Sequence, residues 1–234
     1  MRQIVLDTET TGLEASQGHR IIEIGCVEIV NRRITERRYQ QYINPQREID
    51  AGAVEVHGIT LADLAERPSF ADIAMEFVEF VRGAELVIHN ASFDVGFLNV
   101  ELGLLGAAWG RTEDYCTVFD TLPLAREMHP GQRNSLDALC KRYDISNAHR
   151  ERHGALLDAE LLAEVYLAMT GGQATLELDA GRKHERQGGG KARALQRPAQ
   201  LAVVVPSSED LEAHERALKA VEKASRGACL WMKP

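Results

Sequence analysis

The 234-residue sequence lacks any apolar run near the roughly 20 residues that a membrane-spanning helix needs. It also lacks a basic start followed by an apolar stretch, because an acidic residue already stands at position 7, so we expect no secretory signal. The four cysteines show no paired spacing of the kind that disulfide frameworks use. These absences favour a cytoplasmic protein with reduced thiols, and a hydrophobic share of 44% is enough for one substantial core.

An excess of basic residues is also missing from most of the chain. Residues 1–180 hold 16 Lys and Arg against 29 Asp and Glu, a net charge of −13, whereas residues 181–234 hold 11 against 6, a net charge of +5. Proteins that grip nucleic acid usually neutralise phosphates with a basic surface. If the acidic body acts on nucleic acid, we therefore expect another component to bring the substrate, with metal ions masking part of the charge.

The hydrophobic pattern predicts an α/β fold with a mixed sheet. Residues 3–7 contain a continuous apolar run, Ile4, Val5 and Leu6, which predicts a buried strand. Residues 20–30 and 37–45 predict two further strands that complete an antiparallel meander. Another buried strand is predicted over residues 84–90. Helices are predicted over residues 71–83, 92–106, 118–130, 135–145 and 153–172. Strands followed by alternating helices and strands are typical of the α/β class.

The composition changes after residue 172. Residues 179–200 are rich in glycine and basic side chains, which predicts a flexible linker, and order is predicted to return at residues 201–206. A helix with a serine N-cap should follow, and the tail 201–234 ends in an apolar cluster. This tail exposes apolar side chains that favour a protein partner, with folding back onto its own domain as the alternative. The side chains concerned are Leu211, Leu218, Val221, Leu230 and Trp231.

Two carboxylates one residue apart end the first predicted strand. Asp7 and Glu9 stand at positions i and i+2 of an extended segment, so their side chains point to the same side, and Thr8 between them is expected only to pack. Two such charges repel by about 4 kcal/mol at an effective dielectric of about 20. A bound Mg²⁺ or Mn²⁺ would offset this repulsion. A turn or helix N-cap built from the same residues is the alternative.

Two later aspartates and one histidine extend this acidic set. Asp94 comes one turn into a helix after a predicted buried strand, and Asp158 lies in an apolar-rich helix five residues after His153. Taken singly, Asp158 fits an exposed acidic stripe with Glu160 and Glu164. Taken together, the four carboxylates would balance two divalent cations, which clamp the attacking and leaving oxygens of a phosphoryl displacement. His153 is placed at the helix entrance to take a proton from water.

The order of these motifs resembles that of the DEDDh exonucleases. The pattern is Asp-x-Glu on the first strand, Asp within HNASFD, and His-x4-Asp on the last helix, and it covers about residues 1–170. Within this class the chain is similar to the family of epsilon proofreading subunits of bacterial DNA polymerase III, and HGIT at residues 57–60 also resembles a family segment. The resemblance implies a ribonuclease-H-like mixed sheet flanked by helices, with a 3′→5′ exonuclease domain over residues 1–172.

The resemblance also implies roles for single residues. Asp7 would bridge two metal ions, Mg²⁺ or Mn²⁺, and His153 would be the general base. Glu9, Asp94 and Asp158 would complete the metal ligands.

Four further residues are implied to lie near the terminal nucleotide. They are Thr10, His57, Asn90 and Phe93. Phe93 offers a face for base stacking, although core packing or turn chemistry fits each of these residues equally well.

Partners follow from the same resemblance. Residues 173–178 resemble a peptide that docks on the bacterial β sliding clamp, with Gln173, Leu176 and Leu178 as its anchors. Residues 201–234 resemble the segment that binds the polymerase α subunit, and a linker at 179–200 would tether the nuclease near a single-stranded or frayed primer 3′ end at high effective concentration. The resemblance also allows a small theta-like subunit on the nuclease domain.

Two other functions fit parts of the sequence. An exoribonuclease of the same superfamily that trims RNA 3′ ends would share the site but has less need of a clamp-binding peptide. A non-catalytic adaptor between polymerase and clamp would need only the tail, and the presence of all five catalytic residue types argues against it.

Overall fold

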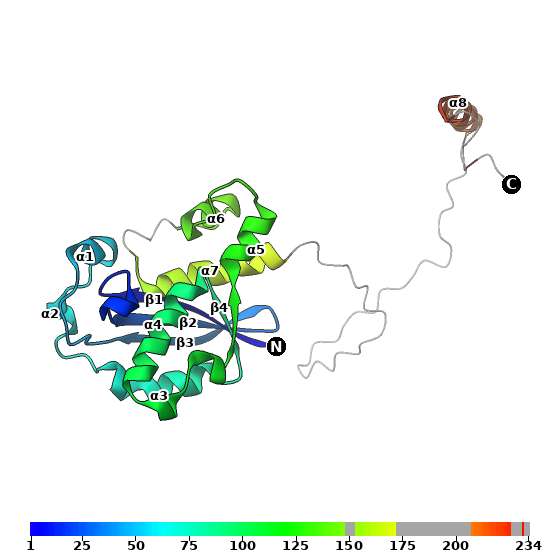
Figure 1. The fold of residues 1–234 in the computed structure, drawn as a ribbon. Helices are drawn as coiled ribbons and strands as arrows, with labels where there is room; N and C mark the ends of the chain where they lie inside the picture. The colour runs from blue at the N-terminus through cyan, green and yellow to red at the C-terminus, as the bar shows by residue number, and fades with distance from the viewer. Residues whose placement is uncertain (148–152, 172–206, 226–230, 232–234) are drawn as a thin grey trace, which may run out of the picture. The chain divides into compact units, whose positions relative to one another are not determined.

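The computed structural model describes residues 1–147, 153–171, 207–225 and 231. The chain divides into two compact units, residues 1–178 and 179–234, which are described separately. A five-stranded sheet with the strand order β3-β2-β1-β4-β5 forms the centre of the first unit (Figure 1). Its strands are β1 (Arg2–Thr10), β2 (Ile21–Val30), β3 (Arg33–Tyr42), β4 (Glu85–Ile88) and β5 (Thr117–Asp120).

The sheet is mixed, as predicted. Strand β1 pairs antiparallel with β2, and β2 pairs antiparallel with β3, which gives the predicted meander. Strands β1, β4 and β5 run parallel to one another, so their carboxyl ends lie at one edge of the sheet. Strand β1 continues to Thr10, so Asp7 and Glu9 lie within the strand and the turn or N-cap alternative is wrong.

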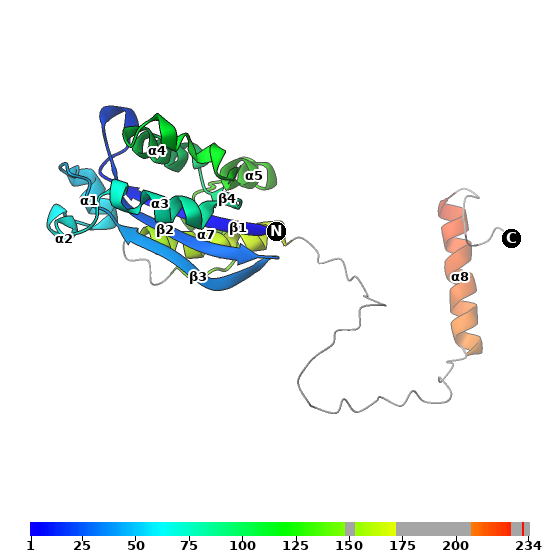
Figure 2. The ribbon, with the colours of Figure 1, turned by 90° about the horizontal axis from the view of Figure 1, so that it is seen from below.

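Helices cover both faces of this sheet. Alternate residues of β1 face opposite sides: Ile4 and Leu6 pack in the larger core cluster with the helices α3 and α4, whereas Val5 packs with α7 (Figure 2). The helices of this unit are α1 (Ala51–His57), α2 (Leu61–Leu64), α3 (Phe70–Val81), α4 (Ala91–Leu104), α5 (Thr121–Met128), α6 (Leu136–Arg142) and α7 (Ala155–Thr170). Three short 3-10 turns lie at Ala15–Gln17, Ala107–Trp109 and Thr112–Asp114.

One predicted helix begins too early. Residues 118–120 belong to β5, and α5 starts only at Thr121, where the Asp120 carboxylate accepts a hydrogen bond from the Leu122 amide at 2.9 Å. A strand of four residues is too short to show a period of two, so its alternation could not be told from the start of a helix. The helices α1 and α2 were not predicted, because seven and four residues are too few to show a clear helical period. Strand β3 spans Arg33–Tyr42 rather than residues 37–45.

The second unit is described only in part. Its helix α8 (Ser208–Ala224) begins after Ser207, whose side chain accepts a hydrogen bond from the Asp210 amide, as the serine N-cap prediction requires. No residue of α8 is buried, and Trp231 is 84% exposed. The predicted clamp-binding peptide at 173–178 (Gln173, Leu176, Leu178), the linker at 179–200, the stretch 201–206 and Leu230 lie outside the described residues.

Within the described ranges, no helix combines the length and the apolar character that a membrane span requires. Cys26 and Cys116 are buried thiols that form no disulfide with a described residue, and Cys140 is buried as well. Burial raises the pKa of Cys116 to about 11, so this thiol stays protonated near neutral pH.

Candidate active site

Three side chains from distant parts of the sequence converge beside the carboxyl end of β1. Ligand atoms of Glu9, His153 and Asp158 all lie within 4.8 Å of one another. Asp158 Oδ2 is 3.1 Å from His153 Nδ1, and its residue is only 3% exposed, so Asp158 does not belong to an exposed acidic stripe. The His153 side chain is 44% exposed, and Asp7, on the same face of β1 as Glu9, is half-buried.

Asp94 reaches the same strand from the other face of the sheet. It lies in the first turn of α4, is 3% exposed, and accepts a hydrogen bond from Thr8 Oγ1 at 2.7 Å. Burial raises the pKa of Asp94 to about 7, against the opposing effect of the Thr8 hydrogen bond, and the nearby Asp120 raises it further. The prediction that Thr8 only packs is therefore wrong, because this hydroxyl binds the third carboxylate of the predicted set.

The start of α7 rests directly on the sheet. Helix α7 has no side-chain cap at Gly154; instead the Ala155 amide donates to Glu23 Oε2 on β2 at 3.1 Å, and Glu23 is 1% exposed. Gly25 pairs with Asp7 across the β1–β2 ladder, and a Cβ at this position would lie 2.2 Å from the backbone of Ala155. These contacts fix the helix that carries Asp158. Sequence reasoning missed them, although an isolated glycine inside a strand pattern is the signal of a close backbone approach.

Helix α4 is fixed in a comparable way. Arg20 forms a two-pronged ion pair with Glu101, with nitrogen–oxygen distances of 2.8 and 2.6 Å, and Glu101 is 1% exposed. Asn90 precedes the helix in a left-handed conformation with φ of 67°, and its backbone N–H donates to Asp120 Oδ1 at 3.0 Å. Asparagine tolerates this conformation better than most residues. The turn from β4 into α4 therefore places Asp94 at the strand ends.

A pocket of about 490 Å³ adjoins the carboxylates, and we call it the β1 pocket. Three of the four residues expected near the terminal nucleotide, Thr10, His57 and Phe93, line it together with Glu9. His57 is buried, and its Nδ1 accepts from the Ile59 backbone amide at 3.0 Å. Its buried Nε2 has no hydrogen-bond partner among the residues that the structure describes. Burial lowers the pKa of His57, which favours the neutral ring, against the opposing effect of a backbone hydrogen bond with Thr10.

Phe93 packs in the core, as one of its two readings expects, and it also borders a pocket. Its ring centroid lies 4.9 Å from that of Phe97, and it packs against the larger core cluster. The same residue also lines the β1 pocket, where a ring face can meet a base.

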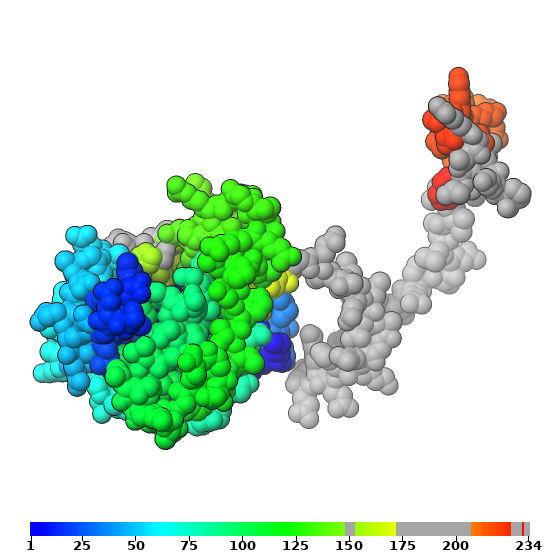
Figure 3. Space-filling model, viewed as in Figure 1, coloured from blue at the N-terminus to red at the C-terminus, as the bar shows by residue number. Residues whose placement is uncertain are grey.

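In the space-filling view, the yellow-green start of α7 reaches the surface between the α1 and α4 segments (Figure 3).

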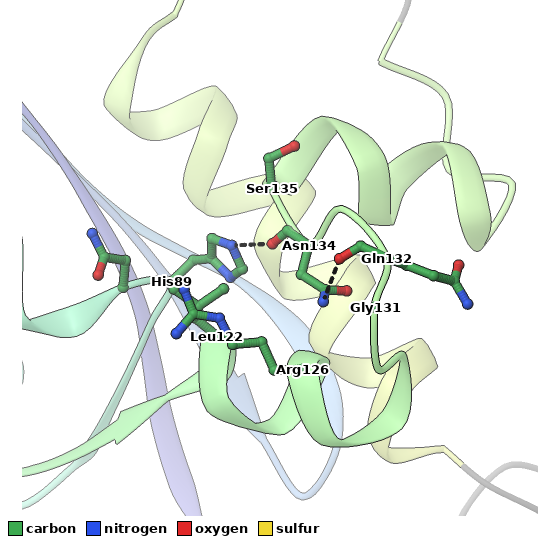
Figure 4. A pocket seen from close by; sticks show the side chains of 8 residues that line it. His89, Leu122, Arg126, Gly131, Gln132, Asn134 and Ser135 are labelled. Atoms are coloured by element: carbon green, nitrogen blue, oxygen red, sulfur yellow. Dashed lines mark hydrogen bonds between the residues drawn. The ribbon is translucent and has the colours of Figure 1, made fainter.

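Asn90, the fourth of these residues, lines a different pocket of about 480 Å³, which we call the α5 pocket (Figure 4). This pocket lies between the end of β4, helix α5 and the loop before α6. Its lining residues are His89, Asn90, Leu122, Arg126, Gly131, Gln132, Asn134 and Ser135.

Known proteins share this architecture and this sequence. The model of the family described as Exonuclease matches residues 4–166. DNA polymerase III subunit epsilon of Salmonella typhimurium is 52% identical over 236 residues, with 98% of this chain and 97% of that protein covered. The same subunit of Escherichia coli K12 is 50% identical at the same coverage.

The chain belongs to this exonuclease family and groups with the epsilon subunits of DNA polymerase III. The predictions of family, of a ribonuclease-H-like fold and of a 3′→5′ proofreading exonuclease are confirmed by this membership. Neither the exoribonuclease nor the non-catalytic adaptor gains support. Enzymes of this family are metal-dependent, and the oxygen-rich donor set described above fits a hard divalent cation.

Solved structures agree at the level of the fold. Exonuclease X in complex with 5′ overhanging duplex DNA superimposes with a TM-score of 0.57 at 26% identity, covering 73% of this chain and 92% of that one. A zinc-bound complex of E. coli exonuclease I with single-stranded DNA gives a TM-score of 0.61 at 19% identity, with 74% and 41% of the two chains covered.

Proposed function

We propose that this exonuclease removes misincorporated nucleotides from the primer 3′ end of a replicative DNA polymerase, using two divalent cations, Mg²⁺ or Mn²⁺. The observation that carries the proposal is the convergence of Glu9, His153 and Asp158 within 4.8 Å, on the face of β1 that also bears Asp7. Asp7, Glu9, Asp94 and Asp158 would hold the metals. When bound, such ions lower the pKa of a water and neutralise charge that develops on the phosphoryl group.

The protein's own residues fit this reaction. Burial raises the pKa of the Asp94 carboxyl because it disfavours the charged form. A cation beside this carboxyl would favour the charged form. His153 is the exposed member of the cluster, so its ring can exchange a proton with solvent after taking one from the attacking water. The hydrogen bond that His153 Nδ1 donates to the Asp158 carboxylate orients that ring.

The β1 pocket supports a role in holding the terminal nucleotide. It is large enough for a nucleoside and joins the apolar face of Phe93 to the polar groups of Thr10 and His57. Within the described ranges His57 Nε2 lacks a hydrogen-bond partner, and because Nδ1 is the acceptor, the Nε2 N–H can donate to a ligand. We place Asn90 at the edge of this binding region, because it opens onto the α5 pocket.

The proposed domain organisation follows the same logic. Residues 1–172 form the nuclease, residues 173–178 bind the β sliding clamp, residues 179–200 act as a linker, and residues 201–234 bind the polymerase α subunit. The similarity to named polymerase subunits over 98% of the chain supports the last assignment, as do the exposed Leu211 and Val221 of α8. A theta-like subunit on the nuclease domain is compatible with this arrangement, and the complex would work in the cytoplasm.

A labelled primer tests the proposed reaction. With Mg²⁺ or Mn²⁺, a 5′-labelled primer with a 3′ mispair should shorten stepwise, and a 3′-labelled primer should release its label as a mononucleotide. Release of long labelled fragments would indicate internal cleavage and would contradict the proposal. Digestion of 3′-tailed RNA in parallel, with and without the polymerase subunit, tests the preference for DNA.

A further inference from the structure

The α5 pocket lies at the same edge of the sheet as the reaction centre. Strands β4 and β5 run parallel to β1, and both end at this pocket, where His89 and Asn90 follow β4 and Leu122 follows β5. Ligands of open α/β sheets characteristically bind outside the carboxyl ends of parallel strands. Asn90 also stands one helical turn, about 6 Å of rise, before Asp94. A strand whose 3′ end reaches the carboxylates can therefore extend into this pocket.

The pocket contains one cationic side chain among its lining residues, that of Arg126 on α5. Arg126 is exposed and makes no hydrogen bond or ion pair with any residue that the structure describes. Its side chain reaches from α5 toward His89 across the pocket, whereas the Gln132 side chain extends away (Figure 4). Arg20 differs from Arg126, because its guanidinium donates two hydrogen bonds to Glu101.

No ion pair joins Arg126 to its neighbours in the part of the chain that the structure describes, and the nearest polar groups are engaged elsewhere. His89 uses both ring nitrogens, Nδ1 with Thr121 Oγ1 at 2.9 Å and Nε2 with the Asn134 carbonyl at 2.8 Å, and burial lowers its pKa. Asp120 Oδ1 accepts from the amides of Asn90 and Leu122 and is thereby committed to the backbone turn. In a unit with a large acidic excess, an uncommitted guanidinium beside the reaction centre marks a place for an anion.

We propose that Arg126 binds a backbone phosphate of the substrate strand, upstream of the scissile bond. This inference rests on the proposed function, because it assumes that the 3′ terminus lies at the Asp7–Glu9 carboxylates. Arginine is a common donor to phosphate oxygens, and such contacts fix the register of a strand without reading its sequence. The contact would hold the strand where the acidic body otherwise repels it.

The substrate's length provides the test. Dithymidine monophosphate has only the scissile linkage, whereas pentathymidylate also carries upstream phosphates. In Arg126→Gln, the ratio of kcat/KM for pentathymidylate over that for dithymidine monophosphate should fall about tenfold, mainly through KM, as expected for one charge-assisted contact. The slope of log KM against log salt for pentathymidylate should become shallower by about 0.7, the value for one phosphate on a single strand.

Neutral linkages identify the phosphate concerned. A neutral methylphosphonate is placed in turn at each upstream linkage of pentathymidylate. In the wild type, one of these substitutions should lower the kcat/KM ratio. In Arg126→Gln, the same substitution should cause no further decrease. Arg126→Lys should recover part of the ratio. Arg33→Gln is the matched control, because Arg33 is exposed at the opposite end of the sheet, and it should keep the wild-type ratio.

The outcomes separate the two proposals. An unchanged length ratio in Arg126→Gln, or an equal loss on both substrates, would overturn the role of Arg126 while leaving the nuclease assignment intact. Failure of the wild-type chain to hydrolyse either oligonucleotide with Mg²⁺ or Mn²⁺ would overturn the proposed function itself.

Discussion

Helices α7 and α8 have nearly equal lengths, 16 and 17 residues, but are stabilised in opposite ways. Nine residues of α7 are buried, and its first turn has no side-chain cap because Glu23 on β2 binds the Ala155 amide. Helix α8 has no buried residue, and a reciprocal capping box between Ser207 and Asp210 closes its first turn. Tertiary packing therefore determines where α7 lies, whereas local sequence alone determines that α8 is a helix.

This difference matches the two tasks that we propose for these helices, catalysis for α7 and recognition of a partner for α8. A catalytic helix must hold Asp158 in a fixed position relative to β1, and burial provides that rigidity. A recognition helix must keep its apolar side chains exposed for a partner, so capping has to replace burial as the source of helicity. The predictions below test this division of labour.

The largest effect is expected from Asp7→Ala in the nuclease body. Hydrolysis should fall by about a thousandfold or more, because a proposed metal ligand is lost. The thermal midpoint should change little or rise, because the change also removes repulsion with Glu9. Deletion of residues 201–234 is the opposite control: it should leave single-strand hydrolysis intact and abolish co-purification with the polymerase subunit. Near-normal activity of Asp7→Ala would refute the site assignment.

Gly25→Val tests whether packing on β2 positions α7. A Cβ at this position would lie 2.2 Å from the Ala155 backbone, so the helix must move, at a cost of about 1–3 kcal/mol or more in stability. Activity should fall at least about a hundredfold, since small displacements of catalytic groups have effects of that order. Gly103→Ala in α4, where a Cβ meets nothing within 4 Å, is the matched control. Equal behaviour of the two variants would show that α7 is not held by this contact.

The buried Asp94 predicts a pH effect confined to the nuclease body. Its folded pKa of about 7 exceeds the unfolded value of about 3.9, so between these values the folded state binds more protons and stability falls as pH rises. In EDTA, the thermal midpoint of the wild type should therefore fall more steeply from about pH 4 to pH 7 than that of Asp94→Asn. Mg²⁺ should remove much of this fall. Parallel curves for both proteins in EDTA would contradict the raised pKa.

Sequence reasoning located the side chains and helix ends whose positions depend on local sequence pattern. The positions of Asp7 and Glu9 follow from the period of a strand, and the caps at Ser135 and Ser207 follow from helix-end chemistry. The Asp94–Thr8 bond could not be predicted in this way, because it joins β1 to a helix residue that stands 86 positions later in the chain. The separation of Asn90 from the β1 pocket likewise depends on how the loop before α6 folds over the end of β4.

The smallest effect is expected from Ser207→Ala in α8. Loss of an N-cap costs about 1 kcal/mol of helix stability, which would weaken binding of the polymerase subunit by about fivefold. Ser208→Ala, at the first helical residue, is the matched control. Neither change should shift the thermal midpoint of the nuclease unit or its hydrolysis of single strands. A shift of that midpoint in Ser207→Ala alone would mean that α8 draws stability from packing as α7 does, and the contrast between the two helices would then fail.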